Sequence, residues 1–144
     1  MKPVDQLLRE KGADFWSVVP DATVFKALEL MAQKNIGALL VMEGEHLVGI
    51  FSERDYARKV VLEGKSSKDI PVHQIMTTKV VCVRPQQSIE ECMALMTDKR
   101  IRHLPVIEGD RVVGVISLGD VVKSKISEQE FIISQLEHYI TGSL

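Results

Sequence analysis

The sequence predicts an α/β (α+β) fold in which two pseudo-symmetric β-α-β-β-α repeats pack sheet against sheet, with an amphipathic helix added at the C-terminus. A hydrophobic content of 45% and a charged content of 26% are typical of a globular domain. The pattern of glycine, two apolar residues, serine, two variable residues and aspartate occurs at residues 49–55 and again at residues 114–120. Alone, each sheet would expose an apolar face, so we expect the two repeats to bury these faces against each other.

Further landmarks keep one constant offset without a gap, which indicates an internal duplication with units of roughly 60 residues. The matched pairs are Pro20 with Pro85, Met31 with Met96, Ile36 with Ile101, Leu39 with Leu104, Gly44 with Gly109, Gly49 with Gly114 and Asp55 with Asp120. We therefore assign residues 1–64 to the first repeat, 65–71 to a polar linker, 72–126 to the second repeat and 127–144 to the C-terminal helix.

The first repeat opens with a short helical pattern at residues 4–8 and continues with an apolar strand at 15–19, which Pro20 ends. Thr23 can cap the helix that follows, and a second apolar strand occupies residues 36–42. A tight turn around a glycine then leads into a third strand, which ends in the first serine–aspartate motif.

The second repeat follows the same order. Its helical pattern lies at residues 72–76, and its first strand, at 80–83, ends before Pro85. Ser88 and the glutamate three residues later form a capping box for the next helix. The strand at 101–107, a tight turn and a last strand lead into the second motif.

Each motif fits a buried strand that runs directly into a helix, because Ser-x-x-Asp is a common way to cap a helix N-terminus. Backbone N–H groups and a nearby cation lower the cost of desolvating a phosphate, so Ser52 and Ser117 are candidate phosphate contacts. Asp55 and Asp120 would repel a phosphate, and we expect them to accept hydrogen bonds from the two hydroxyls of a ribose. The alternative is that each motif is a helix cap and nothing more.

Composition and charge exclude several classes. A net charge of -2 and a pI near 6.1 make nucleic-acid binding improbable. No apolar run approaches the ~20 residues of a membrane-spanning helix, and residues 1–5 lack the apolar core of a signal peptide, so we expect a cytoplasmic protein without membrane contact. Cys82 and Cys92 are expected to be buried thiols rather than a disulfide.

Two β-α-β-β-α units that each end in Gly-apolar-apolar-Ser-x-x-Asp resemble a pair of CBS domains, also called a Bateman module, and the resemblance covers essentially the whole chain. It implies a regulatory module that binds AMP, ADP, ATP, S-adenosylmethionine or NAD in clefts between the repeats, commonly as a disc-shaped dimer. It also implies the ribose role for the two aspartates. Since no part of the chain is left for an enzyme, we expect a stand-alone homodimeric module that regulates another, unidentified protein.

The resemblance also implies an adenine slot along the first strand of each repeat and the strand that follows its helix. For the apolar members of this set, ordinary core packing is an equally good interpretation, because both roles require burial. The slot residues are Ser17, Val18, Thr78 and Val80, with Ile36, Gly37, Ala38 and Ile101 alongside.

The repeats differ chemically. Arg102 and His103 occupy the positions that Gly37 and Ala38 occupy in the first repeat, and Arg54 is matched by a glycine in the second. We infer two unequal clefts. Arg102, His103 and Ser117 are expected to contact phosphate in one cleft, and Ser52 and Arg54 in the other, although Arg102 and His103 could equally be solvated surface groups.

Other functions find less support. We find no catalytic arrangement with a recognisable spacing, and neither the cysteines nor the histidines have the spacing of a metal site, so no catalytic residue or metal is predicted. The main competitor is a structural or partner-docking scaffold with empty clefts. The basic residues Arg54, Arg102 and His103 distinguish the two, because a scaffold has no reason to direct them into clefts.

The residues after 127 form an amphipathic helix with apolar residues at helical spacing. They are Ile132, Ile133, Leu136, Tyr139 and Ile140. We expect this face to cover the protein's own sheet, with the joining of two chains in a dimer as the alternative.

Overall fold

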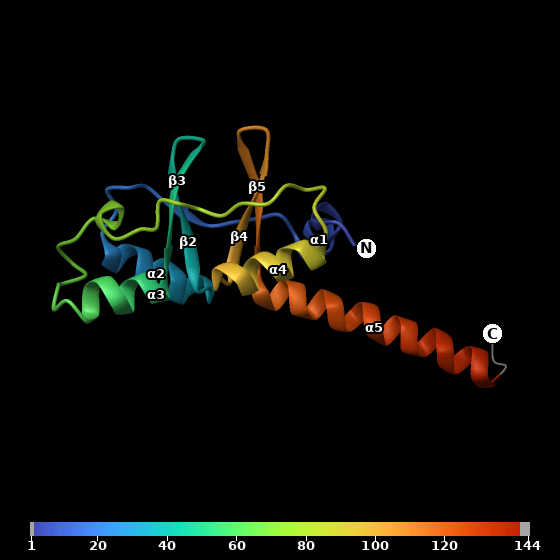
Figure 1. The fold of residues 1–144 in the computed structure, drawn as a ribbon. Coiled ribbons are helices and arrows are strands. Elements are labelled where there is room, and N and C mark those ends of the chain that lie inside the picture. The colour runs from blue at the N-terminus through green and yellow to red at the C-terminus, as the bar shows by residue number, and fades with distance from the viewer. Residues whose placement is uncertain (1, 142–144) are drawn as a thin grey trace.

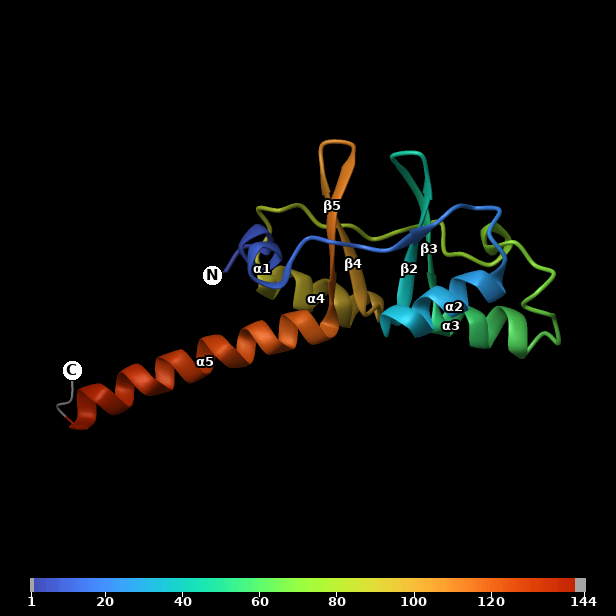
Figure 2. The ribbon, with the colours of Figure 1, turned by 180° about the vertical axis from the view of Figure 1, so that it is seen from behind.

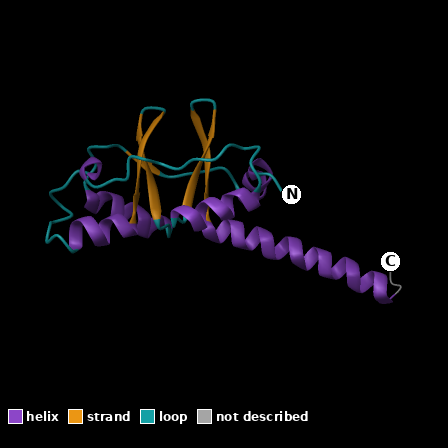
Figure 3. Cartoon of the chain, in the orientation of Figure 1, coloured by secondary structure: helices purple, strands orange, loops and turns teal. Residues whose placement is uncertain are grey.

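The computed structural model describes residues 2–141, which form two similar lobes and one projecting helix (Figures 1 and 2). The hairpins β2–β3 and β4–β5 lie next to each other, with helices along their lower ends and two long connections crossing between the lobes (Figure 3). The elements are α1 (Val4–Lys11), β1 (Ser17–Val18), α2 (Val24–Lys34), β2 (Ala38–Glu43), β3 (His46–Ser52), α3 (Glu53–Tyr56), a π-helical turn (Ala57–Val61), a 3-10 turn (Val72–Gln74), α4 (Ile89–Lys99), β4 (His103–Glu108), β5 (Arg111–Ser117) and α5 (Leu118–Thr141).

The strand pairing confirms the duplication. In the first repeat β1 is parallel to β2, and β2 is antiparallel to β3; in the second repeat β4 is antiparallel to β5. Both hairpins carry a register shift at the same place, after Val41 in one and after Val106 in the other. The two hairpins are therefore copies of one backbone design, down to the bulge that increases their twist.

The first strand of each repeat is shorter than predicted. Residues 15–19 give the two-residue strand β1, and residues 80–83 give a single parallel bridge between Val83 and Val106. In the second repeat the reason is that Thr77 already pairs with Ile50 of the first hairpin, through reciprocal backbone hydrogen bonds of 2.8 and 2.9 Å. The chain must then cross to the second hairpin, so few residues are left to run beside β4.

The two repeats exchange short helical segments. Val4, Leu7 and Leu8 of α1 are buried in the hydrophobic core of the second repeat, although they come first in the chain. Val72 and Ile75, around the 3-10 turn, are buried in the core of the first repeat. Each such side chain contributes about 1.5–3 kcal/mol on burial, so each core depends on residues from the other half of the chain.

The helix starts follow the predicted caps. The Thr23 hydroxyl accepts a hydrogen bond from the Lys26 amide, and the Ser88 hydroxyl accepts one from the Glu91 amide. Both serine–aspartate motifs join a strand to a helix as expected, with Ser52 at the start of α3 and Ser117 directly before α5. These local predictions are confirmed because the capping bonds form within four consecutive residues.

Helix α5 differs from the expectation for the C-terminal segment. It is one continuous helix of 24 residues that starts at the second motif, packs on the lobe through Val121 and Ser124, and then projects away from it (Figure 2). Phe131 is 65% exposed and Tyr139 is 83% exposed. The expectation that this apolar face covers the protein's own sheet is wrong, because the helix leaves the lobe in a straight line.

The close approach of the residue 77 segment to β3 requires a glycine. A Cβ atom at Gly49 would lie 2.5 Å from the Met76 sulfur and 3.0 Å from the Thr77 carbonyl oxygen. We expect Gly49→Val to lower the free energy of unfolding by ~1–3 kcal/mol through overpacking, measured by urea denaturation. Gly119→Ala is the control, because the nearest atom to its Cβ lies at an ordinary 3.6 Å. Equal destabilisation by both changes would contradict this account.

Candidate functional site

Two clefts lie between the repeats. The first cleft, of about 400 Å³, is lined by the motif residues Ser52 to Asp55 of the first repeat and by residues 77, 79–81 and 100–103 of the second. The second cleft, of about 310 Å³, is lined by Ser117 and Asp120 of the second repeat and by residues 14–16 and 35–38 of the first. Each cleft therefore combines the serine–aspartate motif of one repeat with the strand starts of the other.

This arrangement corrects the predicted grouping of the basic residues. Arg102 and His103 line the first cleft together with Ser52 and Arg54, whereas the sequence grouped them with Ser117. Since the repeats face each other, the residues before β4 lie opposite the motif of the first repeat, and Arg102 does not line the cleft of its own motif. His103 also lines the second cleft, so its imidazole is part of the wall between the two cavities.

The remaining predicted residues fall into three groups. The first cleft also holds Gly37, Ala38, Asp55, Val80 and Ile101. The second also holds Ile36, Gly37 and Ala38. Among the described residues, three predicted ones line neither cleft: Ser17 lines a small cavity near the hairpin turns, Val18 packs against the first core, and Thr78 is exposed.

Sequence reasoning missed the aromatic wall of the second cleft, which consists of Phe15 and Trp16. Their counterparts in the first cleft are Val80 and Val81. A signal existed, because Phe15 precedes Val80 by the same offset that separates Pro20 from Pro85. The Trp16 ring is flat, partly exposed and backed by the Lys34 ammonium, 4.1 Å from its centroid.

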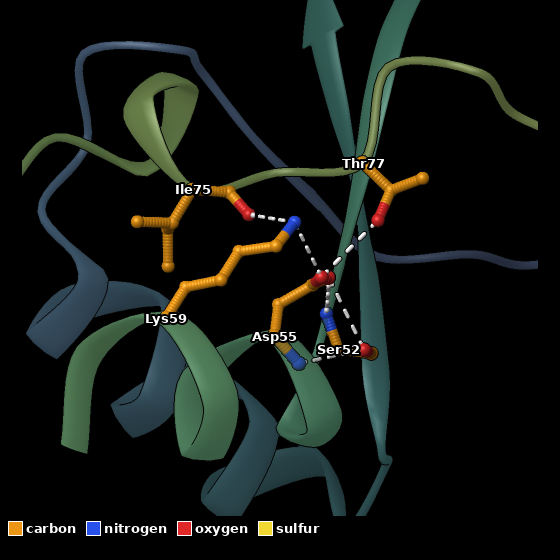
Figure 4. Close-up of polar contacts among 5 residues, drawn as sticks. All are labelled: Ser52, Asp55, Lys59, Ile75 and Thr77. Carbon is orange, nitrogen blue, oxygen red and sulfur yellow. Dashed lines mark hydrogen bonds and ion pairs between the residues drawn. The ribbon is translucent and has the colours of Figure 1, made fainter. Parts of the chain in front are cut away.

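Asp55 is held by the protein itself, as Figure 4 shows. Its Oδ2 accepts hydrogen bonds from the Ser52 amide at 3.0 Å and the Ser52 hydroxyl at 3.2 Å. Its Oδ1 accepts one from the Thr77 hydroxyl at 3.1 Å and lies 3.0 Å from the Lys59 ammonium. Lys59 also donates to the Ile75 carbonyl, so this network ties the helix after β3 to the crossing segment.

Asp120 occupies the equivalent position with fewer partners. Its Oδ2 accepts a hydrogen bond from the Ser117 amide at 2.8 Å and lies 2.9 Å from the Lys11 ammonium. Burial on its own raises the pKa of this carboxyl, but the Ser117 amide and Lys11 together hold that pKa below its ordinary value. The side chain of Asp120 is 26% exposed, whereas that of Asp55 is 8% exposed.

The two clefts also differ in charge. Arg54, Lys79, Arg100 and Arg102 all line the first cleft, and in the described part of the chain none of them has a carboxylate within 4.0 Å. Arg100 is in the left-handed conformation at the end of α4, with φ of 55°, and its carbonyl accepts a hydrogen bond from the Arg54 guanidinium at 2.8 Å. In the second cleft, by contrast, the ammonium of Lys11 is paired with Asp120.

The described residues offer little other chemistry. No group of three or more potential metal-ligating side chains gathers anywhere in residues 2–141. Both cysteines are free thiols, and burial raises the pKa of Cys92 to about 11 and that of Cys82 in the same direction, which makes both poor nucleophiles at neutral pH. Within the same span, no helix is long and apolar enough to cross a bilayer.

Comparisons with known proteins agree with this geometry. The CBS domain family model matches residues 8–62 and 72–127. The mitochondrial CBS domain-containing protein CBSX3 of Arabidopsis thaliana is 42% identical over 136 residues, which cover 91% of this chain and 66% of that protein, slightly less than two thirds. A solved CBS-domain structure from Burkholderia ambifaria MC40-6 is 52% identical, with a TM-score of 0.86 over 89% of this chain and 96% of the other. A hexameric CBS-CP12 protein from cyanobacteria is 30% identical, with a TM-score of 0.74 over 85% and 70%.

His103, in the wall that the two clefts share, should make the free energy of unfolding depend on pH. Burial of His103 lowers its pKa below the ordinary value near 6.5, although Asp120 and Glu53 act in the opposite direction. Between the lowered pKa and about 6.5 the unfolded chain binds more protons than the folded one, so the free energy of unfolding should rise with pH through this window and then level off. Urea denaturation from pH 5 to 8 measures it.

His103→Gln should flatten that rise, and His138→Gln, an exposed histidine on α5, should leave it as in the wild type. If the wild type and His103→Gln show the same pH profile, the imidazole is not the titrating group.

Proposed function

This chain belongs to the CBS-domain family, and from that premise we propose that it is a regulatory module that binds an adenosine-containing ligand in the clefts between its repeats. The candidate ligands are AMP, ADP, ATP, NAD and S-adenosylmethionine. The observation that carries the proposal is the pairing of each serine–aspartate motif with an apolar strand start from the other repeat. A ligand in such a cleft touches both repeats at once.

The chemistry of the clefts supports this class of ligand. A purine ring needs a flat apolar slot, which Phe15 and Trp16 offer in the second cleft and Val80 and Val81 offer in the first. Two charge-assisted contacts of ~1.5–3 kcal/mol each, together with a stacked base, give a micromolar affinity, near ~8 kcal/mol in total. An affinity in this range suits a sensor of changing metabolite levels.

Occupancy would act through the relative position of the repeats. Each core contains a segment from the other half of the chain. A ligand that draws the two hairpins together would therefore also shift the connecting segments that run between the repeats. We propose a binding module rather than an enzyme, acting on a protein that this sequence does not identify. The two free thiols fit a reducing compartment, and we propose the cytoplasm, although the Arabidopsis relative is mitochondrial.

We further propose that the module is a homodimer joined through α5. Exposed apolar residues lie on one side of this helix at successive spacings of seven, three and four residues: Ile126, Ile133, Leu136 and Ile140. Both lysines of this helix, Lys123 and Lys125, lie in its first half, and Glu130 and Glu137 lie in its second, so an antiparallel pair would bring these lysines toward the glutamates of the partner helix.

The second candidate function is a scaffold that docks a different protein. The same projecting helix favours it, because its apolar face is exposed whether or not the clefts are occupied. In this case the clefts would have no ligand, so ligand binding separates the two candidates.

A thermal-shift panel tests the ligand. Protein stripped of carried-over nucleotide is heated with AMP, ADP, ATP, NAD, S-adenosylmethionine or GMP. At a hundredfold excess over its dissociation constant, a ligand adds ~2.7 kcal/mol of stability, which should raise the melting temperature by several degrees for at least one adenosine compound and not for GMP. No shift with any compound, and no nucleotide released on denaturation, would favour the scaffold.

Light scattering coupled to gel filtration tests the dimer. The wild type should elute with twice the mass of the chain, and Ile133→Glu with Leu136→Glu should elute as a monomer, because a buried unpaired charge opposes association. Ser134→Glu on the same helix is the matched control and should remain dimeric. Because association increases with the concentration of the chain, a wild type that is still monomeric at about 100 micromolar would exclude the α5 dimer.

A further inference from the structure

We propose that the two clefts recognise different parts of a ligand: the second reads a ribose through Asp120, whereas the first is a site for phosphate-rich anions that does not read a sugar. The ribose half of this inference rests on the function proposed above, and the anion half does not. The inference starts from the four partners of Asp55 and the unpaired cations beside it.

Asp55 has no acceptor left for a sugar hydroxyl. A carboxylate offers about four lone-pair sites, two on each oxygen. In Asp55 the Ser52 amide and hydroxyl occupy one oxygen, and Thr77 and Lys59 occupy the other, all within 3.0–3.2 Å. The carboxylate is also buried among these donors (Figure 4). A ribose hydroxyl could reach it only by displacing a donor that already satisfies a buried charge, which is unfavourable.

Asp120 has a free acceptor at the equivalent position. Both of its short contacts, from the Ser117 amide and from Lys11, are made by Oδ2. Among the described residues no donor lies within hydrogen-bond distance of Oδ1, and the side chain lines the second cleft. Lys11 neutralises the carboxylate without blocking this oxygen. Oδ1 of Asp120 is therefore available to a ligand in the second cleft, whereas both oxygens of Asp55 are already bound by the protein's own donors.

The first cleft has instead the features of an anion site. Arg54, Lys79, Arg100 and Arg102 line one cavity, and within residues 2–141 none of them has a carboxylate within 4.0 Å, so their positive charges are not neutralised by ion pairs. Of the two acidic groups that line the cleft, Asp55 is matched by Lys59, which leaves Glu53 as the one opposing charge. Guanidinium groups bind phosphate oxygens in bidentate geometry, so several together favour a polyvalent phosphate over a carboxylate or a neutral sugar.

The ligand of the first cleft would be a chain of phosphates. Such a chain occurs both in the tail of a nucleotide and in a condensed inorganic phosphate. Because nothing in the first cleft requires the sugar, we expect inorganic tripolyphosphate to bind there without any nucleoside. Adenosine, which has a ribose and no phosphate, is the complementary probe for the second cleft.

Isothermal titration calorimetry with these two probes tests the division. Tripolyphosphate should bind the wild type and Asp120→Asn equally well, and should bind about tenfold more weakly to Arg102→Ala, because one charge-assisted contact is lost. Adenosine should bind the wild type at one site per chain, should bind Arg102→Ala unchanged, and should lose about tenfold in affinity with Asp120→Asn. The 2′,3′-dideoxy form of adenosine should lose affinity for the wild type to a similar extent.

Different failures have different meanings. Adenosine binding at two sites per chain that are both weakened in the 2′,3′-dideoxy form, or a tight adenosine site that survives Asp120→Asn and is weakened in that form, would show that Asp55 also reads ribose and would overturn the ribose half. Failure of tripolyphosphate to bind the wild type, or binding that Arg102→Ala leaves unchanged, would overturn the anion half. If tripolyphosphate binds as expected but adenosine does not bind, and ATP binds only as tripolyphosphate does, with an affinity that Asp120→Asn leaves unchanged, the proposed adenosine function fails while the anion site is retained.

Variants can also fail to fold, and the design allows for this. Neither Arg102 nor Asp120 belongs to the buried cores, and circular dichroism of each variant checks that its helices are intact. The wild-type measurements alone decide each half of the inference without any variant: the number of sites for adenosine and for its 2′,3′-dideoxy form decides the ribose half, and the binding of tripolyphosphate decides the anion half.

Discussion

The exchange of helical segments between the two repeats is the constraint on which the rest of this structure depends. A unit of about 60 residues buries too little surface to be more than marginally stable alone. Here α1 completes the core of the second repeat, and the 3-10 turn at residues 72–74 lies against the core of the first. Neither core is complete without the other half of the chain, so the exchange keeps the two hairpins next to each other and places the clefts between them.

A duplicated backbone lets the two clefts share a shape while their side chains diverge. Asn35 and Arg100 end their helices with almost the same left-handed φ, 54° and 55°, yet one presents an amide and the other a guanidinium. The two motif aspartates likewise cap equivalent helix starts, but Thr77 and Lys59 saturate one of them and Lys11 leaves the other partly free. The backbone thus defines where a ligand can bind, and a few residues around it decide which chemical group is recognised.

Local signals in the sequence were enough to predict the repeats, the hairpins and the helix starts. Ser52, Ser88 and Ser117 each bond to an amide three residues later, and such contacts depend little on the rest of the fold. What the sequence could not supply was non-local. Whether Arg102 shares a cleft with Ser52 or with Ser117 depends on how the repeats face each other. Similarly, the fourfold contact of Asp55 includes Thr77, which is distant in the chain, and no local pattern announces it.

The position of α5 connects the second cleft to the outer surface of the molecule. Asp120 lies in the first turn of this helix, and Ser117, which accepts the Asp120 amide hydrogen bond, is the last residue of β5. A ligand that donates a hydrogen bond to Asp120 would therefore contact the first turn of α5, a helix of 24 residues that projects from the lobe. A ligand can shift such a helix only by as much as its affinities for the two positions differ. His103 and Gly37 line both clefts, so an anion bound in the first cleft would contact residues that also form the wall of the second.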